Sequence, residues 1–236
     1  MNNISTIAKK EIRSYFYSPA AYILLGFFLL LTGWLYGSHL FLIKEASLRN
    51  IFQLIPLILI FLVPAITMRS ISEERNSGTI ELLCTSPVRD SEIILGKFYA
   101  AFFLLSTAII FTLFYGIIIS FISSPDWGII IAAYIGLLLM GAAYSAIGIF
   151  GSTISKNQIV GFVFSFFIIL IFYLIDKFLY LFPAWLGSIL QYISIDFHFQ
   201  NIARGVIDSR DVIYYLSVIV LFLFFARQSL TKHKYL

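Results

Sequence analysis

Charged residues are scarce in this chain. Only 12% of its 236 residues are Asp, Glu, Lys or Arg, about half the share found in soluble globular domains. Hydrophobic residues make up 60%, and the mean hydropathy is +0.95. This composition excludes an ordinary soluble domain and predicts an all-α integral membrane protein. Because the net charge is only +4 and the basic residues stand beside apolar runs, we expect membrane-lipid contacts and no nucleic-acid partner.

Several other features are missing. The single cysteine, Cys84, excludes an intrachain disulfide. No phosphate-binding loop of the form GxxxxGKS or GxxxxGKT occurs, so the chain is not expected to bind ATP itself. The three histidines lie outside the cores of the long apolar runs, which argues against a catalytic base in the membrane and against an enzyme. No cluster of ligand residues predicts a metal site.

Six apolar runs are long enough to cross a membrane. A spanning helix needs about 20 apolar residues to cross about 30 Å of hydrocarbon. In the last run only residues 212–226 are continuously apolar, and a helix that starts near Asp208 or Ser209, with Asp208 as its cap, becomes long enough. The expected spans are residues 20–43, 51–68, 98–122, 129–150, 159–182 and 210–227.

The distribution of basic residues predicts the orientation of these spans. Eleven of the sixteen Lys and Arg residues fall on the same side as the N-terminus, and five fall on the other. Positive charge is enriched on the cytoplasmic side of membrane proteins, so we expect both termini and residues 69–97 in the cytoplasm.

Two segments outside the spans are also apolar. Residues 1–19 combine an apolar and a basic face at helical spacing, which predicts an amphipathic helix on the membrane surface. Residues 183–211 are too apolar for a solvent loop and too broken for a span, so we expect short helices in the outer leaflet. Asp176 and Lys177 are interpreted as markers of the membrane boundary, because adjacent residues do not face each other on a helix.

Residues 69–97 hold nine of the 28 charged residues, between two apolar runs. Each such charge would cost about 2.5–3.5 kcal/mol at the bilayer centre, so this loop lies in water. Gly78 is expected to end the continuation of the second span, and Thr79 to begin a short helix that stops before Pro87. The leucines of this helix indicate either a docking surface or contact with the membrane surface.

The order of motifs in the loop is distinctive. It reads Glu73-Glu74-Arg75, Gly78-Thr79, Glu81-Leu82-Leu83, Ser86-Pro87 and Gly96-Lys97. Further along come His198-Phe199, Arg204-Gly205-Val206-Ile207-Asp208 and Arg210-Asp211-Val212. Together with the six spans and the amphipathic N-terminal helix, these motifs resemble the permease subunits of the ABC-2 transporter family over essentially the whole chain. Within that family the chain is most similar to single-domain permeases associated with gliding motility.

The resemblance implies a permease subunit of an exporter in the bacterial inner membrane. ATP and Mg²⁺ would be bound by a separate ABC ATP-binding subunit. In the family the loop after the second span carries a coupling helix that docks on this subunit, and the N-terminal helix makes a second contact. A second permease, identical or related, is expected across the small-residue and aromatic faces. The implied coupling residues are Glu73, Glu74, Arg75, Gly78, Thr79, Glu81, Leu82, Leu83, Gly96 and Lys97.

Other residues have structural interpretations. Gly141, Ser145 and Gly148 give the fourth span a small-residue face for close packing against a helix of this chain or of a partner. We expect His198, near Asp196, to cap a short outer helix by a hydrogen bond. In the outer motif, Arg204 and Asp208 are spaced to pair.

Two alternative functions stay open. A stand-alone secondary transporter or channel would normally carry charges within its spans, and here only the peripheral Asp176 and Lys177 qualify. A permease-like protein that transmits force to a partner, without moving a substrate, would have the same charged loop.

Overall fold

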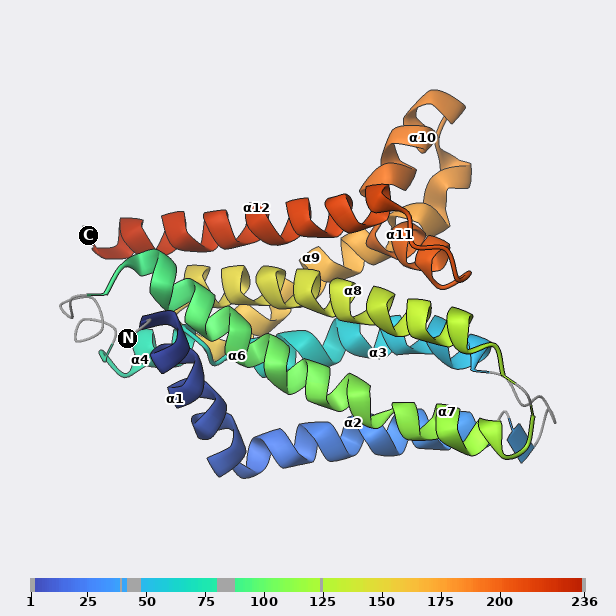
Figure 1. Cartoon of the computed structure of the whole chain (residues 1–236). Coiled ribbons are helices and arrows are strands. Elements are labelled where there is room, and N and C mark those ends of the chain that lie inside the picture. The colour runs from blue at the N-terminus through green and yellow to red at the C-terminus, as the bar shows by residue number, and fades with distance from the viewer. Residues whose placement is uncertain (1–2, 39, 42–47, 80–87, 124, 235–236) are drawn as a thin grey trace.

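The computed structural model describes residues 3–38, 40–41, 48–79, 88–123 and 125–234. Its long helices run side by side as an elongated bundle (Figure 1). Six helical segments are long and apolar enough to cross a membrane, and no strand occurs in the described ranges, so the expected all-α membrane fold is confirmed. The segments are α2 (Pro19–Ser38), α3 (Arg49–Thr67), α6 (Asp90–Phe111) with α7 (Leu113–Ser120), α8 (Trp127–Ile154), α9 (Gln158–Leu174) and α12 (Ser209–Lys234).

Two of these helices extend beyond the apolar runs. The third segment begins at Asp90 instead of residue 98, so the last part of the expected loop is helical. In α12 the helix continues to Lys234, well past residue 227. It begins at Ser209 with Asp208 Oδ1 accepting a hydrogen bond from the Arg210 backbone nitrogen at 2.9 Å, which confirms the predicted start.

Polar side chains fix the starts of other helices. Asp126 Oδ1 accepts from the backbone nitrogen of Gly128 at 2.9 Å where α8 starts. Asn157 Oδ1 accepts from Ile159 N at 2.9 Å where α9 starts. These caps satisfy backbone donors that have no partner within the helix, so each connection ends at a defined residue.

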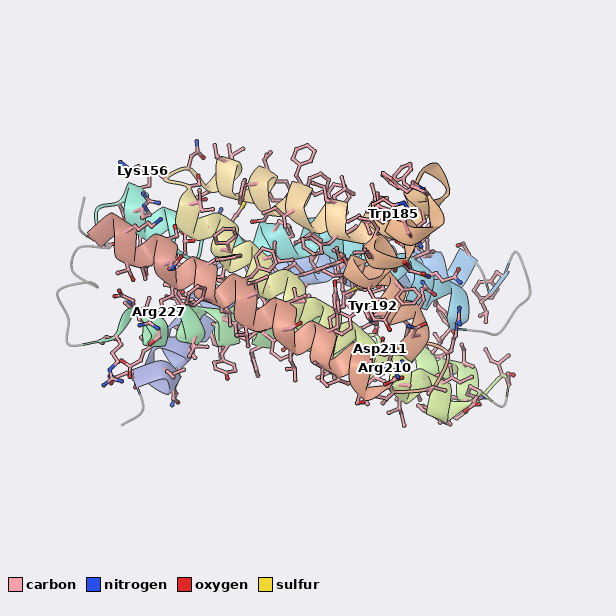
Figure 2. All side chains as sticks on the ribbon, turned by 90° about the horizontal axis from the view of Figure 1, so that it is seen from above. Lys156, Trp185, Tyr192, Arg210, Asp211 and Arg227 are labelled. Carbon is pink, nitrogen blue, oxygen red and sulfur yellow. The ribbon has the colours of Figure 1, made fainter. Side chains whose placement is uncertain are left out.

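The central element is α8. In its most apolar stretch 72% of residues are buried, against 22% for α2 and for α9. The figures show it between α12, α6 and α3, and it contacts all three (Figures 1 and 2). Small residues allow this close approach, since a Cβ on Gly148 would lie 2.1 Å from Thr67 Oγ1 and one on Gly141 would lie 2.6 Å from Leu105 Cδ2.

Shorter helices cover the two ends of the bundle. The end that carries α1 (Asn3–Tyr17), α4 (Ser72–Asn76) and the last turns of α12 is called the terminal end here. The opposite, distal end carries the 3₁₀ helix η2 (Ile175–Leu181), α10 (Ala184–Ile193) and α11 (Ile195–Ile202), with α10 projecting from the bundle (Figure 1). Short helices were expected in residues 183–211, and α10 and α11 lie there. The helix η2 lies within the expected fifth span, whose α-helix, α9, already ends at Leu174.

The outer surface of the bundle is largely apolar. Large side chains such as Trp34, Phe121 and Ile159 are 75%, 87% and 68% exposed. Charged groups gather instead toward the two ends, where Figure 2 labels Lys156 and Arg227 at one end and Arg210 and Asp211 at the other. An apolar belt between two polar ends is the surface that a bilayer requires.

Candidate functional site

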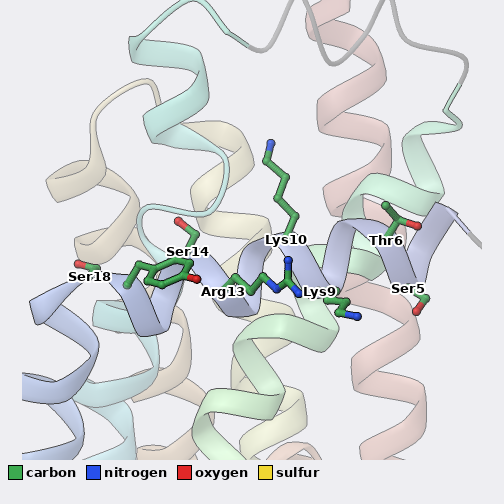
Figure 3. A pocket seen from close by; sticks show the side chains of 8 residues that line it. Ser5, Thr6, Lys9, Lys10, Arg13, Ser14 and Ser18 are labelled. Atoms are coloured by element: carbon green, nitrogen blue, oxygen red, sulfur yellow. The ribbon is translucent and has the colours of Figure 1, made fainter.

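The amphipathic helix α1 crosses the terminal end at an angle to the upright spans (Figure 3). Its polar side, with Lys9, Lys10 and Arg13, is exposed, while Ile4, Ile7 and Ile12 are partly buried, as the sequence pattern predicts. The helix contacts α6 along much of its length. At the closest point, a Cβ on Gly96 would lie 2.7 Å from Ile7 Cγ2, so a larger residue there would push α1 away.

Lys97 is buried at the centre of this end, with its side chain only 2% exposed. Its ammonium group donates to Glu11 Oε1 of α1 at 3.0 Å, to Glu74 Oε1 of α4 at 2.8 Å and to the Ser70 carbonyl at 2.6 Å. All three ammonium hydrogens are therefore used. These contacts join α6 to α1, to α4 and to the bend between α3 and α4, and the group is called the Lys97 node.

The bend between α3 and α4 is also fastened to α8. Ser152 Oγ accepts from the backbone nitrogens of Ile71 and Ser72 at 3.0 and 3.1 Å and donates to the Met68 carbonyl at 3.1 Å. The Arg75 guanidinium donates to the Thr153 carbonyl at 2.7 Å, in the last turn of α8. A cation at that position also interacts favourably with the helix dipole. A displacement of α4 would therefore pull on the central helix.

Two further hydrogen bonds at the terminal end join α1 and α12 to the start of α6. Asn3 Nδ2 donates to the Glu92 carboxylate at 3.2 Å, which joins the first turn of α1 to α6. The hydroxyl of Thr231 donates to Asp90 Oδ2 at 2.9 Å, which joins α12 to α6. Both links involve the first turn of α6, so this helix is the common attachment point of the two terminal helices.

The structure separates the expected coupling residues into two groups. Glu73, Gly78 and Thr79 are exposed, and Gly78 has the positive φ of 71° expected of a helix stop. Gly96 and Lys97 are buried and Glu74 and Arg75 are partly buried, with Glu74 bonded to Lys97 and Arg75 bonded to the Thr153 carbonyl. These four residues make contacts within the chain, and their implied part in coupling stays a prediction. Glu81, Leu82 and Leu83, with the expected short helix, lie outside the described residues.

A cavity of about 630 Å³ opens beside the Lys97 node. Its walls come from the polar side of α1 and from the stretch between the α3–α4 bend and Thr79, including Lys10, Glu73 and Ser77. Both charge signs line it, so the surface is suited to polar contacts with another chain. Across the described ranges, no three His, Cys, Asp or Glu side chains come together as metal ligands would.

At the distal end a second charged cluster fastens the short helices. Lys177 Nζ lies 2.6 Å from Asp196 Oδ2 and 3.1 Å from Asp176 Oδ2. The expectation that the neighbours Asp176 and Lys177 do not face each other is wrong, because both lie in the 3₁₀ helix η2 and form an ion pair. Their interpretation as markers of the membrane boundary stays a prediction. Burial raises the pKa of Asp196, and the hydrogen bond from Lys177 opposes this shift.

His198 is buried and lies between two acceptors. The ring of Tyr214 stacks on its imidazole ring, with 3.9 Å between the two ring centroids. Its Nδ1 is 2.6 Å from Asp211 Oδ1 in the first turn of α12, and its Nε2 is 3.0 Å from the Tyr192 carbonyl. Tyr192 lies in the last turn of α10, so this contact is of the kind that the predicted capping role requires. The partnership with Asp211 was not foreseen, since thirteen residues of sequence separate the two.

Two expectations about the distal end and the fourth span need correction. Arg204 and Asp208 form no ion pair in the described structure, because Gly205, with φ of 96°, turns the chain between them. The face of Gly141, Ser145 and Gly148 is covered by α6 and α3 of the same chain, so it is not free to meet a second permease.

Comparison with known protein families gives one assignment. The chain matches the family model described as ABC-2 family transporter protein over residues 10–227. No curated protein matches it. The match reaches from α1 into α12 and includes the Lys97 node and the distal charged cluster of Asp176, Lys177 and Asp196. The chain therefore belongs to the ABC-2 family of transporter proteins, as a multi-pass transmembrane permease.

Proposed function

We propose that this permease is the membrane subunit of an ATP-driven transporter and that its terminal end receives a separately encoded ABC ATP-binding subunit. That subunit would hold ATP and Mg²⁺, in keeping with the lack of a phosphate-binding loop in this chain. The observation that carries the proposal is the Lys97 node. It lies beside the exposed Thr79 and joins α4 and the α3–α4 bend to α6 and α1.

In this account docking and transmission use different residues. The partner contacts the exposed part of the loop, with Thr79 and the sequence-implied Glu81, Leu82 and Leu83. When ATP closes the ATPase dimer, the loop moves and displaces α4. Glu74 passes the movement through Lys97 to α6 and α1, and Arg75 passes it to the end of α8. Since α8 is the most buried span, its displacement rearranges the whole bundle.

Further features of the proposal come from the sequence. The excess of Lys and Arg at the terminal end supports a cytoplasmic position for both termini and for the loop, in a bacterial inner membrane. The family resemblance supports export and a second permease, identical or related. With the small-residue face of α8 covered, that partner is expected on exposed aromatic faces. The resemblance to GldF, a single-domain permease associated with gliding motility, supports a role in gliding. Normal gliding after loss of the chain from its native cell would reject that role.

The test uses variants that separate docking from transmission. Tagged chain is purified in mild detergent, and both the co-purified ATP-binding subunit and its ATPase activity are measured. Leu82→Asp should lose the subunit. Lys97→Met should retain it but lose the ATPase stimulation that the permease provides. Lys156→Glu changes an exposed charge at the same end and should alter neither.

Two results would reject the proposal. One is that no ABC ATP-binding subunit accompanies the intact wild-type chain. The other is that Leu82→Asp and Lys156→Glu retain the subunit equally well. A chain that binds the subunit and moves a bound partner, without transporting a substrate, would instead favour the force-transmitting alternative.

A further inference from the structure

A second cavity, of about 420 Å³, lies beneath the elbow between α1 and α2. This size is within the range of sites for small ligands. One half is apolar, with Ala21 and Ile66 at 3% and Leu104 at 1% exposure, and with Ile23 at its open side. The other half is polar and is lined by Ser14, Ser18, Arg69 and Glu73, among others. The cavity is thus amphiphilic along its length.

The polar half contains two opposite charges that no side chain neutralises. Arg69 and Glu73 are exposed and four residues apart, yet within the described ranges neither forms an ion pair or a side-chain hydrogen bond. The other carboxylate at this site, Glu11, is already held by Lys97. A guanidinium and a carboxylate that face the same opening can bind a ligand that carries both an anion and a cation.

The cavity lies where the membrane surface is expected. Figure 3 shows Ser14 and Ser18 on α1 and its junction with α2, where the transverse helix meets the upright spans. Amphipathic helices of this kind lie at the boundary between headgroups and acyl chains. The polar half of the cavity therefore lies at headgroup depth, and its apolar half lies along α2 and α3 at acyl-chain depth.

We propose that this cavity binds one membrane phospholipid whose headgroup carries a phosphate and a primary ammonium group. Arg69 binds the phosphate, Glu73 accepts hydrogen bonds from the ammonium group, and Ser14 and Ser18 contribute hydroxyls. One acyl chain lies against Ile23, Ile66 and Leu104. The role given to Glu73 differs from ATPase docking, and the site requires only a membrane-embedded chain, so it does not depend on the proposed function.

The headgroup chemistry follows from the charges. A phospholipid with only a negative headgroup would place uncompensated charge beside Glu73, which costs binding energy. A quaternary ammonium headgroup has no N–H to donate to the Glu73 carboxylate. Phosphatidylethanolamine carries both groups, whereas phosphatidylglycerol lacks the amine and phosphatidylcholine lacks the N–H. Comparison with phosphatidylglycerol therefore tests the need for the amine, and comparison with phosphatidylcholine tests the need for its N–H groups.

The experiment measures lipid binding without an ATPase. Purified chain is reconstituted into vesicles that contain a photoactivatable analogue of one of the three lipids, and labelled peptides are quantified. Phosphatidylethanolamine should label residues 20–24 and 65–73 about tenfold more than the other two lipids, as expected for one charge-assisted hydrogen bond. Arg69→Met should reduce this labelling to the level of the lipid-facing surface, and Glu73→Gln should abolish the preference for phosphatidylethanolamine.

Two further variants complete the design. Arg227→Met removes an exposed arginine at the same end, on α12, and should leave the labelling unchanged. Ala65→Phe fills the apolar half and should block labelling while Arg69 and Glu73 stay in place. Equal labelling by all three lipids, or labelling that persists in both Arg69→Met and Ala65→Phe, would show general lipid contact only and overturn the proposal.

Discussion

Replacing Lys97 with methionine tests whether the Lys97 node holds the terminal end together. The variant keeps most of the side-chain volume but removes the ammonium group that lies between Glu11, Glu74 and the Ser70 carbonyl. Two carboxylates, only 17% and 18% exposed, then lose their shared cation. Breaking a buried ion pair from one side costs about 3–5 kcal/mol, and the residual hydration of the carboxylates places this case at about 3 kcal/mol.

Thermal unfolding followed by tryptophan fluorescence in detergent measures this loss. For a chain of this size 1 kcal/mol lowers the melting temperature by about 2–4 °C, so Lys97→Met should lower it by about 6–12 °C. Adding Glu11→Gln and Glu74→Gln should recover part of the loss, because the unpaired charges are removed. Lys156→Met, at an exposed position, is the control. A shift for Lys97→Met no larger than that of the control would show that the Lys97 node does not hold the terminal end together.

Three further predictions concern other contacts, each read from the same unfolding measurement. Ser152→Ala leaves the backbone amides of Ile71 and Ser72 without their acceptor and should lower the free energy of unfolding by about 2 kcal/mol. The control, Ser188→Ala at an exposed position, should lower it little. Equal shifts in melting temperature would contradict the attachment of the α3–α4 bend to Ser152. Gly148→Ala should cost about 1–3 kcal/mol because its Cβ would overlap Thr67, while Gly26→Ala, with nothing within 4 Å, should be neutral or stabilising. Burial raises the pKa of Tyr15 to about 12, so the folded state retains a proton that the unfolded state loses above pH 10. Wild type should therefore lose stability between pH 10 and about 12, and Tyr15→Phe should lose less; identical alkaline profiles would rule out this burial effect.

The sequence was sufficient for features that depend on local pattern. Six apolar runs predicted the six spans, because length and hydropathy alone decide whether a helix can cross a bilayer. The basic and apolar faces of α1 and the stop at Gly78 were equally readable, since each depends on neighbours within one or two turns.

Features that depend on contacts distant in sequence were missed. Lys97 was named as a coupling residue from the family resemblance, but its burial and its ion pair with Glu11, which is 86 residues away, could not be read from the sequence. The hydrogen bond between Ser152 and Ile71 crosses 81 residues, and no local motif indicates it. The small-residue face of α8 was correctly read as a packing surface, but its partner helices could not be identified without the fold.

The prediction for the charged residues at the distal end was wrong for a different reason. Adjacent residues diverge on an α-helix, so Asp176 and Lys177 were not expected to face each other. The chain changes to a 3₁₀ helix at Ile175, and Lys177 then reaches both Asp176 and Asp196. Only the position of α11 reveals that this stretch closes onto a carboxylate.

Site-specific photo-crosslinking in native membranes can show whether the terminal end receives an ABC ATP-binding subunit. A photoreactive amino acid replaces Thr79, which is exposed beside the Lys97 node. In a matched chain it replaces Ser123, which is exposed between α7 and α8, and these two helices are connected at the opposite end of the bundle (Figure 1). We expect an adduct with an ABC ATP-binding subunit from position 79 and none from position 123. Adducts from position 79 that contain no such subunit, or equal adducts from both positions, would contradict the account.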